Sequence, residues 1–277
     1  MRVHHLNCGS FCPHGARLIT GRGGWLSQGL MVCHCVLLET DRDGLILIDT
    51  GIGTRDCTQV NKWPAGMRSI SRPRLDQDET AIHQIKKLGF EAKDVRHIIV
   101  THLDLDHAGG LADFPDAVVH VHETEHARAM NPSNLLERRR YLSSQWSHGP
   151  KWETYGEFGD RWFGLDAVNA LRGVQAELAL VPLVGHTEGH TAIAIRQPED
   201  WMIHAGDAYF YKGQIDQPPS CPALLEYFQK SIALNDRLRR ENLSRLRELN
   251  TREAGNVEIF CAHDPDEFFH MSKRNNP

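Results

Sequence analysis

The chain has 277 residues, 31 of them basic and 36 acidic, and its formal net charge is −5. Apolar residues make up 40% of the chain and charged residues 24%, which is typical of a globular domain with a real core and excludes a disordered chain or a fibrous repeat. The longest apolar runs, such as 45–48, are far shorter than the roughly 18–20 residues that cross a bilayer, so no membrane partner is expected. The acidic balance argues against a nucleic-acid partner.

The number of cysteines and the first residues of the chain predict a location in the reducing cytoplasm. The chain has seven cysteines, an odd number, which argues against a complete disulfide framework. The opening segment MRVHHLN lacks the apolar stretch of a secretory signal, so we expect a cytoplasmic protein. The unusual count is that of histidine, with 17 residues, because histidine is the commonest metal ligand.

The first half of the chain alternates predicted strands with one helix. A β-hairpin is expected from 31–39 and 45–49, and it leads into a glycine-rich loop over 49–53. Apolar residues at helical spacing then predict a helix over 76–88. Short apolar runs predict strands over 97–100 and 117–121.

The second half begins with helical pattern and returns to strands. A helix is predicted from 123 to about 142, with a break at Pro132, followed by an irregular stretch over 146–163. Later elements are strands over 178–183, 191–196, 201–205 and 257–261, and a long helix over 224–249. This order predicts an α+β fold, with two halves that share one core in a single domain over 1–277.

The strongest motif is His-x-Asp-x-Asp-His, formed by His102, Asp104, Asp106 and His107 directly after the strand predicted over 97–100. Imidazole and carboxylate groups are the side chains that hold Zn, Fe or Mn. Four such groups in one turn would repel one another or need partners without a cation. The motif therefore predicts a metal site.

Three further segments place histidine or aspartate just after a predicted strand. They are 185–190 with His186 and His190, 204–208 with Asp207, and 261–264 with His263. Each is weak alone, but all lie at the carboxyl ends of strands, where sites in mixed α/β folds usually gather.

These four segments, in this order, resemble the metallo-β-lactamase superfamily of binuclear metallohydrolases. The motif of that family is His-x-His-x-Asp-His, followed by a distant His, a bridging Asp and a final His. Asp49-Thr50-Gly51 matches the early strand-end aspartate of the family, and 185–190 and 262–264 look most like the branch of the N-acyl homoserine lactone lactonases. The resemblance implies an αββα sandwich.

The resemblance also implies two divalent metal ions. His102 and His186 would hold the first ion, Asp106, His107 and His263 the second, and Asp207 would bridge both. Asp104 stands where the family has its second histidine. As a ligand of the first ion it would favour Fe or Mn there, whereas Zn is the metal expected otherwise. Asp49 and His190 are expected to orient the ligands.

The implied activity is that of a lactonase-like or esterase-like hydrolase. It would cleave an ester, lactone or thioester bond of a small substrate by attack of a metal-bridging hydroxide, with Asp106 and Asp207 as catalytic residues. The lactonase branch has a tyrosine three residues after the bridging Asp. Phe210 stands there in this chain, so Tyr209 and Tyr211 are both candidates to contact the substrate oxygen.

Two other functions remain open at this point. Asp104 suggests a redox-active di-iron protein of the same fold, and a phosphodiesterase or β-lactamase-type hydrolase is the other alternative. The expected partner is a small-molecule substrate, and the sequence leaves a homodimer open.

A helical and aromatic insertion at about 123–165 is expected to form a lid over an apolar substrate. Long irregular segments are often functional, and this one would be lined by Trp146, Trp152 and Tyr155. The basic runs 138–140 and 237–240 are interpreted as solvated helix faces.

Overall fold

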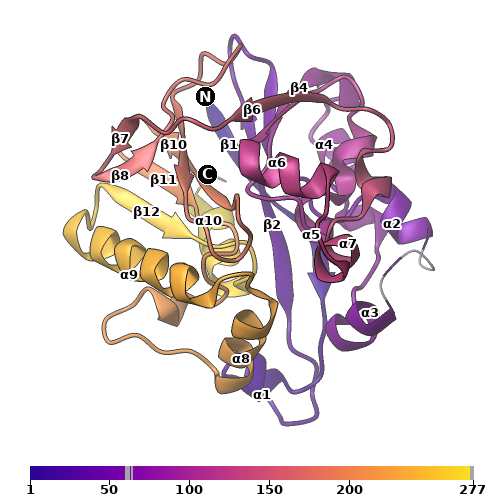
Figure 1. The fold of residues 1–277 in the computed structure, drawn as a ribbon, viewed down its shortest axis with the longest axis vertical. Helices are drawn as coiled ribbons and strands as arrows, with labels where there is room; N and C mark the ends of the chain where they lie inside the picture. The colour runs from indigo at the N-terminus through magenta and orange to yellow at the C-terminus, as the bar shows by residue number, and fades with distance from the viewer. Residues whose placement is uncertain (60–62, 64, 275–277) are drawn as a thin grey trace.

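The computed structural model describes residues 1–59, 63 and 65–274. Two β-sheets pack face to face, with helices on their outer sides (Figure 1). The larger sheet has the order β1-β2-β3-β4-β5-β6. Its strands are β1 (Arg2–Phe11), β2 (Met31–Glu39), β3 (Leu45–Ile48), β4 (Val95–Ile99), β5 (Val118–His122) and β6 (Lys151–Tyr155). The predicted hairpin is confirmed, because β2 and β3 pair antiparallel, whereas β3 to β6 run parallel.

The smaller sheet has the order β12-β11-β10-β9. Its strands are β9 (Leu178–Pro182), β10 (Thr191–Arg196), β11 (Trp201–His204) and β12 (Val257–Phe260). The neighbours β11 and β12 are parallel, so their carboxyl ends meet at one edge of the sheet. A separate antiparallel ribbon joins β7 (Asp160–Trp162) and β8 (Leu165–Ala167).

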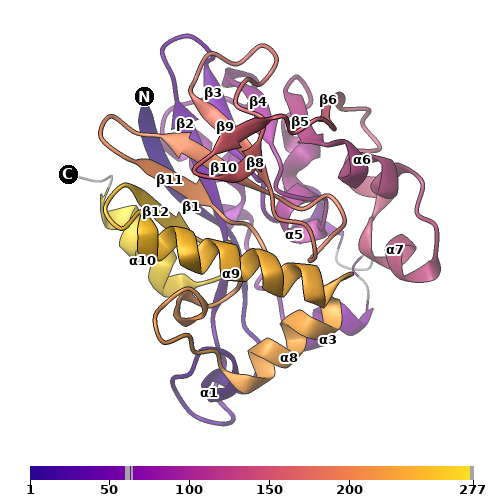
Figure 2. The same cartoon turned by 60° about the vertical axis from the view of Figure 1, so that its left-hand side comes forward.

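Helices cover the outer face of each sheet (Figures 1 and 2). The larger sheet is covered by α4 (Ala81–Lys87), α5 (Leu105–Ala108) and α6 (Glu123–Met130), and the smaller one by α9 (Asp236–Arg252). The other α-helices are α1 (Ala16–Ile19), α2 (Thr54–Thr58), α3 (Ala65–Ser71), α7 (Leu135–Arg140), α8 (Ala223–Ile232) and α10 (Pro265–Arg274). Short 3-10 turns are η2 (Gln77–Glu79), η3 (Ala92–Asp94), η4 (Gly109–Asp113), η5 (Ser143–Trp146) and η6 (Lys212–Gln214).

The strands have two apolar faces, as a sheet buried on both sides requires. In β3, Leu45 and Leu47 pack on the helical side, whereas Ile46 and Ile48 pack against the smaller sheet. This alternation follows from the two-residue period of a strand. The result is the predicted αββα sandwich.

Two element predictions differ from the structure in detail. The long helix predicted over 224–249 is two helices, because the side chain of Asn235 accepts a hydrogen bond from the backbone of Leu238 and caps a new helix there. The stretch 146–163, predicted to be irregular, contains β6 and β7. Trp, Thr and Tyr are strand-forming residues, and the neighbouring glycines concealed that pattern. The predicted break near Pro132 is confirmed by the gap between α6 and α7.

All seven cysteines lie in the described part of the chain and are free thiols. No helix of the described residues combines the length and the apolar character needed to cross a membrane.

Candidate metal centre

The four His/Asp motifs meet at one edge of the sandwich, because each follows the end of a strand. The segment 101–107 leaves β4, and 183–190 connects β9 to β10. Asp207 follows β11, and His263 follows the parallel neighbour β12. Ligand-type side chains that are distant in sequence are therefore brought together by the ends of both sheets.

The converging side chains form two clusters of three. One contains His102, His186 and Asp207, and the other contains Asp106, His107 and His263. The donor atoms of each cluster lie within 4.8 Å of one another, and all six residues are buried. Each set has the ligand chemistry of a divalent metal site.

Asp207 directs one carboxylate oxygen toward each cluster. Its Oδ2 lies 3.2 Å from Nε2 of His186 and 3.8 Å from Nε2 of His102. Its Oδ1 lies 3.1 Å from Nε2 of His263 and 3.2 Å from Nε2 of His107. This is the arrangement that a carboxylate shared by two ions requires.

Several of these atoms have no hydrogen-bond partner although they are buried. They are Nε2 of His102, Nε2 of His107 and Oδ1 of Asp207. Buried polar atoms without partners destabilise a fold, and they are uncommon in native proteins. All three atoms belong to the two clusters, and divalent cations would supply the missing partners, so the residues present fit a pair of such ions.

Asp49, at the end of β3, orients His107. Its Oδ2 accepts a hydrogen bond from Nδ1 of His107 at 2.8 Å, and both oxygens accept from Thr101. Burial alone would raise the pKa of Asp49, but the facing His107 holds it below its usual value. The imidazole is thereby fixed with Nε2 directed at Asp207.

His190 uses both ring nitrogens for the protein itself. Its Nδ1 lies 3.0 Å from the carbonyl oxygen of Leu183, and its Nε2 accepts a hydrogen bond from the backbone N–H of Asp207 at 2.9 Å. This bonding leaves no nitrogen for an ion. It instead fixes the turn that presents the Asp207 carboxylate.

Asp104 lies beside the first cluster, but it faces a cation of the protein. Nε of Arg140 donates to Oδ1 of Asp104 at 2.6 Å, and Nη2 donates to Oδ2 at 2.8 Å. Oδ2 of Asp104 also lies 3.1 Å from Nε2 of His186. The same oxygen lies 3.4 Å from Nε2 of His102. Asp104 therefore forms a bidentate ion pair with Arg140 at the edge of the first cluster, and the set of His102, His186 and Asp207 does not include it.

Arg140 was missed by the sequence interpretation, which treated 138–140 as a solvated face. Its side chain is only 11% exposed, whereas Arg138 and Arg139 are exposed. The sequence cannot show which of three consecutive arginines turns inward, because that depends on how α7 packs against the rest of the protein. The second basic run is corrected in the same way, because Arg239 is buried and paired with Asp236.

The two clusters differ in their electrostatic surroundings. Burial, followed by the neighbouring Arg140, lowers the pKa of His186 to about 4. Burial alone would also lower the pKa of His107, but Asp207 and Asp49 hold it well above its usual value. The pKa of His263 is raised too, because Asp207 outweighs burial. The second cluster is therefore the more negative environment.

The two candidate tyrosines lie in different places. Tyr209 is fully buried in the core of the smaller sheet, where its hydroxyl donates to Oε1 of Glu267 at 2.9 Å. The prediction that Tyr209 contacts the substrate is therefore wrong. Phe210 faces the site, with its ring centroid 4.6 Å from that of His263, and Tyr211 is half-buried next to it.

The three aromatic residues predicted to form a lid pack within the larger half instead. Trp146 is buried in the core between the larger sheet and its helices. Tyr155 is buried at the end of β6, with its hydroxyl 2.8 Å from Nδ1 of His120, and the ring of Trp152 packs on His126. The lid prediction is therefore wrong for these residues, because the segment adds a strand to the sheet.

A cavity of about 270 Å³ opens next to the second cluster. Its wall includes His263 and the apolar side chains of Ile19, Met31, Phe210 and Leu225. Tyr211 also lines it. The cavity therefore places an apolar wall beside His263 of the second cluster.

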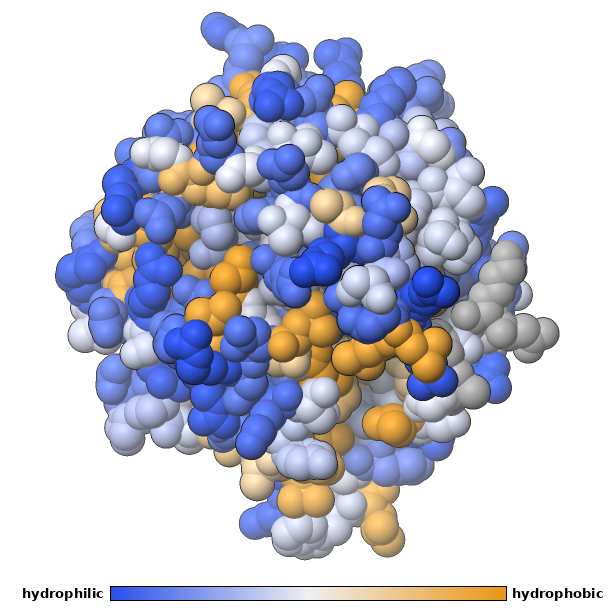
Figure 3. Space-filling model, in the orientation of Figure 1, coloured by the Kyte–Doolittle hydropathy of each residue, from blue (hydrophilic) through white to orange (hydrophobic). Residues whose placement is uncertain are grey.

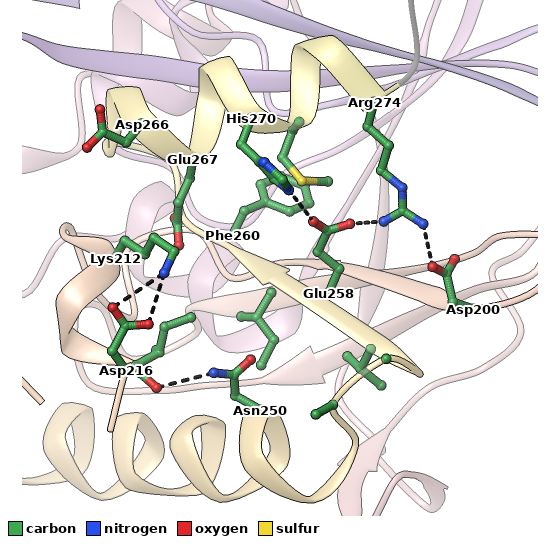
Figure 4. Close-up of a pocket in the computed structure, with 16 residues that line it drawn as sticks. Asp200, Lys212, Asp216, Asn250, Glu258, Phe260, Asp266, Glu267, His270 and Arg274 are labelled. Carbon is green, nitrogen blue, oxygen red and sulfur yellow. Dashed lines mark hydrogen bonds and ion pairs between the residues drawn. The ribbon is translucent and has the colours of Figure 1, made fainter. Parts of the chain in front are cut away.

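A larger cavity, of about 670 Å³, lies between α10 and β12 and is lined by none of the predicted site residues (Figure 4). Several of its charged side chains form ion pairs with one another. Arg274 pairs with Asp200 and Glu258, and Lys212 pairs with Asp216.

The sandwich and its edge of histidines and aspartates define a class of metallohydrolase. Residues 29–263 match the model of the metallo-beta-lactamase superfamily, and the chain belongs to that superfamily. It is 40% identical over 267 residues to a probable metallo-hydrolase of Mycobacterium tuberculosis, a match that covers 96% of this chain and 81% of the relative. The protein is thus a metal-dependent hydrolase with the predicted fold.

Lactonases are among its relatives. The N-acyl homoserine lactonase AttM of Agrobacterium fabrum is 28% identical over 237 residues, which is 85% of this chain and 83% of AttM. The solved structure of an N-acyl homoserine lactone hydrolase, with N-hexanoyl-L-homoserine bound at its catalytic metal centre, superposes with a TM-score of 0.71. The match covers 97% of this chain and 95% of the other at 19% identity, so it supports the fold alone.

Proposed function

We propose that this metallohydrolase uses two divalent ions to cleave a lactone, ester or thioester bond of a small substrate with an apolar tail. The observation that carries the proposal is the cavity beside His263. Of the six candidate ligands, His263 lines this cavity, together with the apolar side chains of Ile19, Met31 and Leu225. A substrate whose carbonyl group lies at the second cluster would therefore have its tail against these side chains.

The size and surroundings of the cavity favour a small substrate. Its volume, about 270 Å³, lies just below the range of about 300–1,000 Å³ typical of small-molecule sites. The segments that line it also expose Trp25, Leu26 and Leu224. Figure 3 shows apolar side chains gathered below the centre of this face, down toward α8 and α1. An acyl chain would therefore meet apolar surface both inside the cavity and around it.

The residues of the chain would divide the work as follows. The clusters His102–His186–Asp207 and Asp106–His107–His263 would hold the ions, and Zn is the metal we expect. When bound, such ions supply a water of lowered pKa as nucleophile and polarise the scissile carbonyl. Asp49 and His190 would keep His107 and Asp207 in orientation. Tyr211, on the cavity wall, is the remaining tyrosine that can donate to a substrate oxygen.

The relatives support the same reaction class. AttM, at 28% identity over 237 residues, is an N-acyl homoserine lactonase. The redox alternative was suggested by Asp104, and both oxygens of that residue are engaged by Arg140. A phosphodiester would need cationic groups on the cavity wall, where Arg22 is already paired with Asp266.

The test is a substrate panel assayed with purified protein loaded with Zn, Mn or Fe. The panel contains N-acyl homoserine lactones of increasing chain length, aryl esters, thioesters, phosphodiesters and β-lactams. We expect turnover of the lactones, esters or thioesters, with a kcat/KM that rises with the length of the acyl chain. Preferred turnover of phosphodiesters or β-lactams would contradict the proposal.

One matched pair of variants locates the tail. Ile19→Trp fills the cavity, so it should raise KM for long-chain substrates at least about tenfold and leave short-chain substrates unchanged. Leu26→Trp is the control, because Leu26 is 88% exposed on the neighbouring loop. Equal effects of the two variants would show that the tail binds elsewhere.

A further inference from the structure

Arg140 is held at the first cluster by three different segments of the chain. Two of its nitrogens bind both oxygens of Asp104, and Nη1 donates to the carbonyl oxygen of Ile232 at the end of α8. Its Nη2 also lies 2.7 Å from Nε2 of His186. The guanidinium is therefore a fixed part of this site, and its side chain is only 11% exposed.

Through its contact with His186, the guanidinium of Arg140 competes with a metal ion for the same ligand nitrogen. Nε2 of His186 is the donor atom that faces Oδ2 of Asp207, at 3.2 Å. A lone pair that accepts a hydrogen bond from Arg140 is not free to bind an ion at the same time. An ion in the first cluster must displace this hydrogen bond and then remain close to a permanent positive charge.

The charge balance of the two clusters points the same way. Beside the first cluster, Arg140 neutralises Asp104, so that Asp207 is the acidic group left for the ion. The second cluster has its own Asp106, and Asp49 adds a further negative charge behind His107. His263, at the same position, is oriented by the carbonyl oxygen of Val32, 2.8 Å from its Nδ1. A divalent cation is therefore better compensated in the second cluster.

We propose that Arg140 makes the two metal positions unequal. The second cluster, Asp106–His107–His263, fills first and binds its ion tightly. The first cluster, His102–His186–Asp207, fills second and binds its ion more weakly by about 10–100-fold, the size of change that altering a group in contact with metal ligands typically causes. Asp104 then acts as the anchor of Arg140, a positioning residue. This inference rests on the proposed metal centre and goes beyond it, because it assigns an order of filling.

The test is a titration of the metal-free protein with Zn²⁺, followed by calorimetry and by competition with a chromophoric chelator. The unmodified protein should show one tight and one weak class of site. His263→Ala should remove the tight class, and His186→Ala should remove the weak class. Two classes of equal affinity, or the opposite assignment, would overturn the proposal without any variant of Arg140.

Variants of Arg140 then separate charge from packing. Arg140→Gln removes the charge and keeps hydrogen-bonding atoms, so it should tighten the weak site by about tenfold or more. Arg140→Lys keeps the charge and should leave the site weak. Arg139→Gln is the matched control, because Arg139 is the exposed preceding residue of α7. Circular dichroism checks that each variant is folded.

If Arg140→Gln and Arg140→Lys weaken the site equally, Arg140 acts only as a structural support, and the proposal is wrong. None of these measurements uses hydrolysis. A negative substrate panel would contradict the proposed reaction and leave the metal titration valid. Two equal metal sites would contradict the role of Arg140 and leave the proposed reaction standing.

Discussion

Oδ2 of Asp49 accepts a hydrogen bond from Nδ1 of His107 at 2.8 Å, and this single contact decides which nitrogen of the imidazole faces Asp207. The carboxylate is itself fixed by the backbone and the hydroxyl of Thr101. The orientation of a candidate ligand therefore depends on the end of β3, more than fifty residues earlier in the chain.

Asp49→Asn should weaken metal binding at the second position by about 10–100-fold, because the amide lacks the negative charge and sets a donor against His107 or Thr101. Zn²⁺ competition titration measures this change. Asp41→Asn is the control, since Asp41 is an exposed residue of the adjoining hairpin turn. An unchanged affinity in Asp49→Asn would show that His107 does not bind the ion.

Asp104→His alone should fail to strengthen the first position. It brings the sequence to the motif His-x-His-x-Asp-His, but it leaves Arg140 without its carboxylate, next to His186. We expect the weak Zn²⁺ site to become weaker still, by about tenfold. The double variant Asp104→His with Arg140→Gln should bind two Zn²⁺ ions with similar affinity. Two tight sites in the single variant would contradict this prediction.

Tyr209→Phe should leave metal content and KM unchanged but lower the free energy of unfolding by about 1–3 kcal/mol. The substitution removes the hydroxyl that donates to Oε1 of the buried Glu267. Oε2 of that carboxyl still accepts from the backbone N–H of Cys261, but Oε1 loses this partner. Tyr211→Phe should have the opposite profile, with normal stability and reduced kcat/KM, because Tyr211 lines the cavity. Denaturant unfolding and steady-state kinetics on both variants provide the comparison.

The metal-free protein should lose stability as the pH falls below about 6.5. Burial, followed by the neighbouring His97, lowers the pKa of His120 to about 3. The unfolded chain therefore takes up a proton at His120 that the folded chain does not, and stability declines as the pH falls toward the folded value. Between pH 6.5 and 5 this group contributes a loss of about 2 kcal/mol.

His120→Gln should reduce that loss, and His14→Gln, at an exposed position, should not. Urea unfolding at several pH values, with a chelator present, measures the difference. Identical pH dependence in both variants would show that His120 is not the titrating group.

The sequence predicts well which candidate ligands come together, because much of their pattern is local. His102, Asp106 and His107 follow a short apolar strand, and that pattern survives without knowledge of the tertiary structure. Asp207 and His263 also follow predicted strands, and the resemblance to the metallo-β-lactamase superfamily implied that they join the same centre.

The same reasoning fails where orientation is set by docking. Position 140 does not differ in residue type from 138 and 139, and only the packing of α7 directs Arg140 inward. Tyr209 and Phe210 are neighbours of similar size, and the turn after β11 decides which one faces His263. Trp152 and Tyr155 belong to β6, a strand at the edge of the larger sheet. The composition of this segment, aromatic residues beside glycines, is compatible both with an aromatic loop and with a strand.

Neither cluster belongs to one half of the sandwich. His102, Asp106 and His107 come from the loop after β4 in the larger sheet, and their partners His186, Asp207 and His263 come from loops of the smaller one. An ion in either cluster would therefore join the two sheets, in addition to the apolar contacts of their inner faces and to hydrogen bonds such as that between Nε2 of His204 and the carbonyl oxygen of His34. The free energy of unfolding then depends on the free metal concentration. At a free concentration a thousandfold above Kd, one such ion adds about 4 kcal/mol to the free energy of unfolding.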